Sequence, residues 1–185
     1  MTSILSPLSD FSFVSPDVLE AASAFGTAVH LACELWDKGD LDEVELDPAL
    51  VPYLAGWKQF SEDWKVEWTM VEERVFQPTH RYAGTLDRFG TVTSPLSGDC
   101  TTAVVDIKSS VALYPSVGPQ LSAYKEAILE STNKTQRIAV QLKADGSYVA
   151  KTYTDRYDWP MFLSLLTLKN WCDRHSITPN FKKRK

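Results

Sequence analysis

Apolar residues recur at steps of three and four over positions 18–36, a spacing typical of the buried face of a helix. The stripe consists of Val18, Ala22, Phe25, Val29, Ala32 and Trp36. Ser15 is a favourable N-cap residue, Pro16 suits the first helical position and Gly39 can end a helix. The sequence therefore predicts a helix from Pro16 to about Gly39. A second apolar face predicts another helix over residues 48–65.

The pattern then changes to segments rich in Val, Thr, Tyr and Phe, which are typical of strands. Strands are predicted over residues 68–76, 81–92 and 101–108. A further pair over 136–143 and 147–153 flanks Asp145-Gly146, a signal for a two-residue hairpin turn. Helices are predicted from Gly118 to about residue 130 and over residues 159–175. This order predicts an α/β fold with a mixed β-sheet flanked by helices, rather than a doubly wound parallel sheet.

Composition limits the class of protein. The chain has 185 residues, 44% of them apolar and 23% charged, as in a globular domain. We expect one domain over residues 1–185 with a short basic tail at about 182–185. The three cysteines form no Cys-x-x-Cys pair, so they signal neither a zinc ribbon nor an iron–sulfur cluster. The N-terminal segment lacks a secretory pattern and the longest apolar stretches are too short to span a bilayer, so a cytoplasmic protein without a membrane partner is expected.

Charge is distributed unevenly along the chain. Residues 1–100 carry 6 basic and 17 acidic side chains, whereas residues 101–185 carry 13 basic and 7 acidic ones. A surface that is simply uneven is one explanation. The other is a basic surface for a polyanion next to an acidic cluster that holds cations, with Lys125 and the terminal basic residues as candidate phosphate contacts.

Two strand carboxylates are candidates for a metal site. Residues at i and i+2 of a strand share a face, so Asp106 and Lys108 are predicted to lie side by side. Asp87 ends the segment A-G-T-L-D at positions 83–87 and lies near Asp106 if its strand pairs with the next one. Two close carboxylates repel, and a hard divalent cation between them removes that conflict. An exposed ion pair and a turn-capping aspartate are the ordinary structural alternatives.

Two helical patterns supply further polar side chains. His30 follows Gly26 by one turn, beside the apolar stripe. A glycine inside a helix costs about 1 kcal/mol relative to alanine, which indicates close packing around His30. Gln120 and Tyr124 are four residues apart and share a helical face. A structural histidine and a core tyrosine are the competing explanations.

In chain order the patterns are G-T-x-V-H at positions 26–30, a glutamate at 72 or 73, A-G-T-L-D at 83–87, V-V-D-I-K at 104–108 and Q-L-x-x-Y at 120–124. Strand parity leaves both glutamates open. The series resembles the PD-(D/E)xK nuclease superfamily, in particular its RecB-type branch and the related phage recombination exonucleases. The resemblance covers about residues 26–124, just over half of the chain, and implies a restriction-endonuclease-like core.

The resemblance also implies a role for each residue of the series. The implied metal ligands are His30, Asp87, Asp106 and the backbone carbonyl of Ile107. The implied catalytic residues are Asp87, Asp106, Lys108, Glu72, Gln120 and Tyr124, with Lys108 as the catalytic lysine and Glu73 as the rival of Glu72. The implied cofactor is one or two Mg²⁺ or Mn²⁺ ions per site, without an iron–sulfur cluster.

The function implied by the resemblance is hydrolysis of phosphodiester bonds from duplex DNA ends, in phage-type recombination or DNA processing. The expected partners are DNA ends and their single-stranded tails, in a bacterial or phage-infected host cell, and a single-strand annealing protein is left open. Phe25 stands where close relatives carry a polar or basic residue, and neither cluster cysteines nor a helicase motor accompany the motifs, which favours a stand-alone nuclease.

Two other functions remain open at this point. One is a structure-selective endonuclease or junction resolvase on the same core. The other is a catalytically silent nucleic-acid-binding module. The intact Asp87, Asp106 and Lys108 argue against the silent module, because loss of activity is usually accompanied by loss of one such residue.

Overall fold

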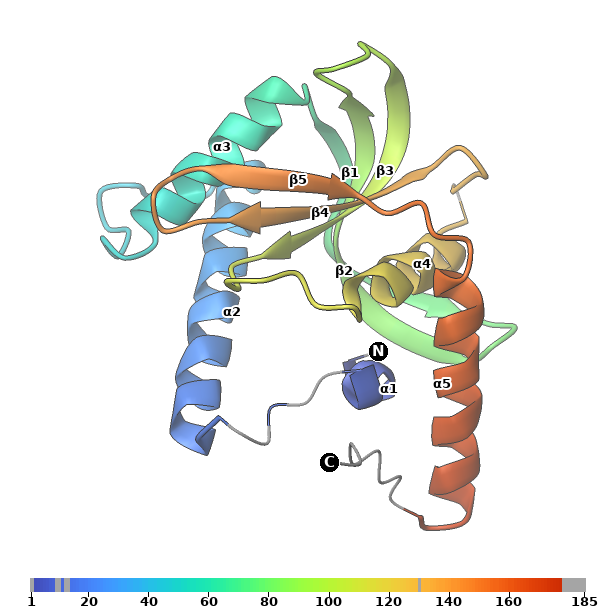
Figure 1. Cartoon of the computed structure of the whole chain (residues 1–185). Coiled ribbons are helices and arrows are strands. Elements are labelled where there is room, and N and C mark those ends of the chain that lie inside the picture. Colours follow the sequence, from blue (N-terminus) through green and yellow to red (C-terminus); the bar gives the residue numbers. More distant parts are fainter. Residues whose placement is uncertain (1, 9–10, 12–13, 130, 178–185) are drawn as a thin grey trace.

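A computed structural model describes residues 2–8, 11, 14–129 and 131–177 of the chain (Figure 1). The first elements are α1 (Thr2–Leu5), a 3₁₀ turn (Ser6–Leu8), α2 (Pro16–Lys38) and α3 (Val51–Asp63). Three strands follow, β1 (Glu67–Gln77), β2 (Tyr82–Thr93) and β3 (Cys100–Lys108). The remaining described elements are α4 (Val117–Ala127), β4 (Gln136–Leu142), β5 (Tyr148–Thr152) and α5 (Asp158–Arg174). The predicted basic tail at 182–185 lies outside the described residues.

The five strands form one sheet in the order β1-β2-β3-β4-β5. Neighbouring strands are antiparallel except β3 and β4, which are parallel. They can be parallel because α4 carries the chain back between them. The predicted α/β class, with a mixed sheet flanked by helices, is confirmed. The narrower prediction of a restriction-endonuclease-like core stays a prediction.

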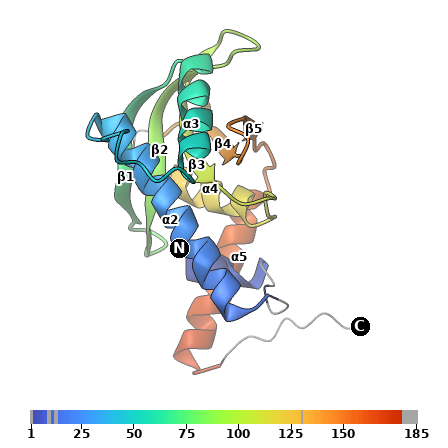
Figure 2. The same ribbon diagram turned by 90° about the vertical axis from the view of Figure 1, so that its left-hand side faces the viewer.

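Helices cover both faces of the sheet. Val105 and Ile107 of β3 pack in one cluster with Trp57 of α3 and with residues of α2. The side chain of Val104 points to the opposite face of the sheet, where it packs with Leu121 of α4 in a second cluster. Figure 2 views the molecule from the side on which α2 and α3 lie. Helices α1 and α5 form a third cluster with α4 and do not enter the layer of α2 and α3.

Both ends of α2 lie where the sequence predicts them. Pro16 is the first helical residue, although the side chain of Ser15 makes no capping hydrogen bond. Gly39 has φ 75°, and its backbone N–H donates to the carbonyl of Trp36 at 3.0 Å. A left-handed glycine that satisfies a free helical carbonyl is a common way to end a helix.

The apolar stripe of α2 is buried only near its C-terminal end. Val29 and Ala32 are buried, whereas Val18 is 57% exposed, because the helix extends beyond the sheet (Figure 1). Within the described residues α2 is also the one helix long and apolar enough to cross a membrane, contrary to the expectation that no stretch is. This is weak evidence, since core helices and signal sequences pass the same test, and the C-terminal half of α2 packs on the sheet.

Several local features differ from the sequence prediction, among them the end of α4 at Ala127 rather than at about 130. Helix α3 begins at Val51 rather than at 48, because residues 48–50 form a turn. The β4–β5 turn is not a two-residue turn: the N–H of Lys143 donates to the carbonyl of Ser147 at 3.0 Å, which encloses three residues, 144–146, and Gly146 among them has φ 85°. Helix α1 was not predicted, because four residues are too few to show a helical period.

Candidate metal centre

The polar residues of the site gather where β2 and β3 separate. The ladder between these strands ends at the pair of Arg88 and Val105, and Asp87, the residue before Arg88, lies just outside it. Strand β3 continues to pair with β4 as far as Lys108. The backbone N–H of Ile107, beyond the β2–β3 ladder, donates to Asp87 Oδ2 at 2.7 Å. The fork therefore holds the Asp87 carboxylate between two strands, close to Asp106 as the sequence predicted.

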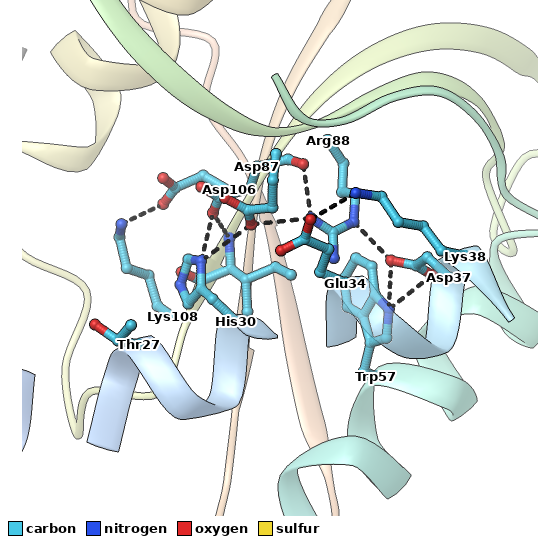
Figure 3. A network of polar contacts seen from close by, with 12 residues as sticks. Thr27, His30, Glu34, Asp37, Lys38, Trp57, Asp87, Arg88, Asp106 and Lys108 are labelled. Atoms are coloured by element: carbon cyan, nitrogen blue, oxygen red, sulfur yellow. Dashed lines mark hydrogen bonds and ion pairs between the residues drawn. The ribbon is translucent and has the colours of Figure 1, made fainter. Parts of the chain in front are cut away.

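His30 reaches this fork from α2 with both ring nitrogens (Figure 3). Nε2 lies 3.0 Å from the carbonyl oxygen of Ile107. Nδ1 lies 3.5 Å from Glu72 Oε1 and 3.6 Å from Asp87 Oδ2. A carbonyl oxygen only accepts hydrogen bonds, so Nε2 donates to it and Nδ1 is left facing the two carboxylates. Burial acts to lower the pKa of His30, but Asp87 and Glu72 raise it to about 9.

Glu72 joins the site and Glu73 does not. Val71 pairs with Arg88 in the β1–β2 ladder, so the next position, Glu72, lies opposite Asp87. Glu72 has φ 51°, in the left-handed region that residues other than glycine seldom adopt. Its side chain is 20% exposed and contacts His30, whereas Glu73 is exposed to solvent. The geometry thus selects Glu72 from the two glutamates that strand parity left open.

His30, Glu72 and Asp87 could hold a metal ion together. One ligand atom from each residue lies within 4.8 Å of the other two. An imidazole nitrogen with two carboxylate oxygens suits several divalent cations. A cation at this position would also offset the repulsion between the two carboxylates. The expectation of a metal site is supported to this extent, and Mg²⁺ or Mn²⁺ as its occupant stays a prediction.

Asp106 and Lys108 lie side by side on β3, as the strand period predicts. Lys108 Nζ is 2.6 Å from Asp106 Oδ2. The side chain of Asp106 is 1% exposed, and neither carboxylate oxygen makes a hydrogen bond within the described part of the chain. Burial, and to a smaller degree Asp87, raises the pKa of Asp106 to about 6, while Lys108 opposes that rise. Burial lowers the pKa of Lys108, but the neighbouring Asp106 raises it above its ordinary value.

The other implied ligands occupy different positions relative to this group. Asp106 is not one of the three residues whose ligand atoms lie within 4.8 Å of one another. Its Oδ1 has neither a hydrogen bond nor an ion pair within the described chain. The carbonyl oxygen of Ile107 accepts from His30. A buried, unpartnered carboxylate oxygen next to the cluster is a free ligand, so the residues present fit a bound divalent cation.

Tyr124 of α4 lies near the site, and Gln120 contacts its hydroxyl. Tyr124 is 6% exposed, and its ring packs in the cluster formed by α4 and the sheet. Burial raises the pKa of the Tyr124 hydroxyl, and Asp87 adds to this rise, while a hydrogen bond with Gln120 acts against it. Tyr124 is therefore both a core residue and a neighbour of the carboxylates, so the two explanations drawn from the sequence are compatible.

The expectation of close packing at Gly26 is wrong. A methyl group placed on Gly26 would meet one atom within 4 Å, Ser109 Oγ at 3.6 Å. That distance is an ordinary van der Waals contact. The position therefore tolerates a larger side chain, and packing around His30 does not explain the glycine.

Sequence reasoning missed Arg88 and Asp37. Arg88 is fully buried and contacts both Glu72 and Asp37. Two signals could have revealed them. Arg88 is a charged residue between apolar ones in a segment with strand composition, and Asp37 lies seven residues after His30, two turns along the same helical face.

Lys125 is held by the protein itself. Its Nζ donates to the carbonyls of Thr135 at 2.9 Å and Asn133 at 3.4 Å. Burial lowers the pKa of Lys125, and Arg137 adds to that effect. These contacts give Lys125 a structural role in joining α4 to the loop before β4, so it is a poorer candidate for a phosphate contact than its sequence position indicated.

No family model matches the chain, and no curated protein sequence matches it. The functional argument therefore depends on the geometry of the fork and on the chemistry of its side chains.

Proposed function

We propose that the chain is a metal-dependent deoxyribonuclease of the PD-(D/E)xK superfamily that hydrolyses phosphodiester bonds from duplex DNA ends. The observation that carries the proposal is the fork between β2 and β3. There a histidine and two carboxylates meet within 4.8 Å, next to a buried aspartate paired with a lysine at 2.6 Å. Phosphodiester hydrolysis requires both parts of this arrangement: ligands for a divalent metal ion, and a positively charged side chain, here Lys108, beside them.

The ligands of the proposed Mg²⁺ or Mn²⁺ are His30, Glu72 and Asp87, with the free oxygen of Asp106 beside them. When bound, such a cation neutralises charge on a phosphate and makes a water molecule more acidic. Asp87 is held ready for this role by the Ile107 N–H at 2.7 Å. The carboxylates therefore need little rearrangement to receive a cation.

Lys108 supplies a positive charge next to the ligands. Its side chain is 24% exposed, so it can contact a substrate while Asp106 holds its ammonium. In this proposal it donates hydrogen bonds to the attacking water or to the phosphate oxygens as negative charge develops there. Gln120 and Tyr124 add an amide and a hydroxyl on the α4 side.

The test uses two substrates in one reaction series: an end-labelled linear duplex and a closed circular duplex of the same sequence. We expect mononucleotides from the linear duplex with Mg²⁺ or Mn²⁺, intact circles, and no product with EDTA. Cleavage of circles would indicate a structure-selective endonuclease instead. Full activity in EDTA, or no cleavage of either DNA with both metals, would contradict the proposal.

A further inference from the structure

Arg88 is the one arginine that is fully buried among the described residues. Its Nε donates to Asp37 Oδ2 at 2.6 Å, and its NH1 donates to Glu72 Oε1 at 3.0 Å. NH1 also donates to the backbone carbonyl of Asp87 at 2.7 Å. One guanidinium therefore holds the side chain of one candidate ligand and the main chain of another.

Asp37 anchors the far side of this guanidinium. Its carboxylate is 2% exposed and accepts hydrogen bonds from Trp57 Nε1 at 3.1 and 3.2 Å. The guanidinium carbon of Arg88 lies 5.4 Å from the centre of the Trp57 ring, a favourable cation–π distance. Arg88 is thus held from two sides within the protein, and its third partner, Glu72, is the one with access to solvent.

Glu72 needs such support. Its φ of 51° is strained for a residue with a side chain, and strained residues persist where their surroundings hold them. The Oε1 atom that accepts from Arg88 also lies 3.5 Å from His30 Nδ1. Arg88 therefore holds the same Glu72 oxygen that lies near His30.

We propose that Arg88 is a positioning residue that presents Glu72 to the metal site, with Asp37 as its buried anchor. The inference depends on the proposed function, because it names a residue acting on the same cation. The positive charge of Arg88 also offsets part of the repulsion among Glu72, Asp87 and Asp106. Replacing Asp37 by a neutral residue leaves Arg88 to pair more strongly with Glu72, which draws Glu72 away from a cation.

The test is titration of Mn²⁺ alone into the full chain, with free Mn²⁺ followed by electron paramagnetic resonance. Mutation of residues that hydrogen-bond to metal ligands typically lowers metal affinity by about 10–100-fold. We expect Asp37→Asn and Arg88→Lys each to weaken Mn²⁺ binding within that range. Arg88→Lys keeps the charge and most of the side-chain length, but one ammonium cannot hold Asp37 and Glu72 in the same fork.

The matched control is Asp158→Asn. Asp158 pairs with Arg137 at 2.7 Å, and both side chains are nearly buried, at 13% and 10% exposed. We expect a lower melting temperature and unchanged Mn²⁺ affinity for this variant. Wild-type-like affinity in Asp37→Asn and Arg88→Lys would overturn the inference about Arg88 alone. A wild-type chain that binds no Mn²⁺ would overturn the proposed function as well. Should Asp37→Asn not fold, the charge-conserving Arg88→Lys decides the outcome.

Discussion

The carboxylate of Asp87 accepts a hydrogen bond from the backbone N–H of Ile107 at 2.7 Å, just beyond the last paired residues of β2 and β3. A side chain thus satisfies a backbone group that the sheet leaves free. The same oxygen lies 3.6 Å from His30 Nδ1. Asp87 Oδ2 thus contacts both the backbone of β3 and His30. The separation of β2 and β3 therefore positions Asp87 as a candidate ligand.

Replacing Asp106 by asparagine tests the metal site with a side chain of the same shape. The substitution removes a carboxylate whose Oδ1 is free to bind a cation, and it also removes the ion pair with Lys108. We expect Asp106→Asn to abolish cleavage while DNA affinity is retained and the melting temperature falls, because Lys108 loses its partner. The measurements are single-turnover cleavage, DNA binding by fluorescence anisotropy, and thermal unfolding.

Asp173→Asn is the matched control for that change. Asp173 is on α5, its side chain is 60% exposed, and it pairs with Lys169. Cleavage should be unaffected, since surface ion pairs contribute little. Normal cleavage by Asp106→Asn would remove Asp106 from the chemistry.

Lys108 is predicted to act on the chemical step more than on binding. Its Nζ lies 2.6 Å from Asp106 Oδ2, beside the candidate ligands. Lys108→Ala should lower the single-turnover rate at saturating DNA by about 10²–10⁴, the range for lost acid–base or electrostatic assistance. Lys108→Arg should not restore the rate, because a planar guanidinium does not replace a compact ammonium. A variant that binds DNA weakly but cleaves bound DNA at the normal rate would make Lys108 a phosphate contact only.

The raised pKa of His30 predicts that the stability of the metal-free chain depends on pH. Its pKa is raised from 6.5 to about 9, chiefly by Asp87 acting against burial. The stability it contributes is therefore fully present below pH 6.5 and is lost as the pH rises through about 9, on the order of 3 kcal/mol in total. Denaturant unfolding in EDTA at pH 6, 7.5 and 9 (roughly spanning the window) measures this loss.

His30→Gln should flatten that dependence. The control is His80→Gln, because His80 packs against Trp159 at 5.4 Å, away from the carboxylates. The control should keep the slope of the wild type. An equally steep decline in His30→Gln would show that other groups cause it.

Replacement by alanine should raise the free energy of unfolding at Gly26 and lower it at Gly90. A methyl group on Gly26 meets only Ser109 Oγ, at 3.6 Å, so Gly26→Ala should raise the free energy of unfolding by about 1 kcal/mol through helix propensity. A methyl group on Gly90 would overlap the carbonyl oxygen of Glu67 and the Cα of Trp68. Gly90→Ala should therefore destabilise the chain by about 1–3 kcal/mol or more. Denaturant unfolding compares the two, and a destabilised Gly26→Ala would mean tighter packing there than the geometry shows.

Much of the local structure follows from the sequence alone. The helical period around Val29 predicts α2, and the strand period predicts that Asp106 and Lys108 share a face. These features depend on backbone geometry, which repeats with a fixed spacing in every helix and strand. The candidate ligands His30 and Asp87 were also identified from sequence patterns, and the geometry brings them together.

Other features were decided by tertiary structure. Glu72 rather than Glu73 enters the site because its backbone adopts φ 51° opposite Asp87, and such strain requires support from the surrounding protein. The contacts of Arg88 with Asp37 and Glu72 join the paired strands β1 and β2 to helix α2, which lies much earlier in the sequence. No periodicity within one segment encodes such contacts, because they form only when α2 packs against the fork between the strands.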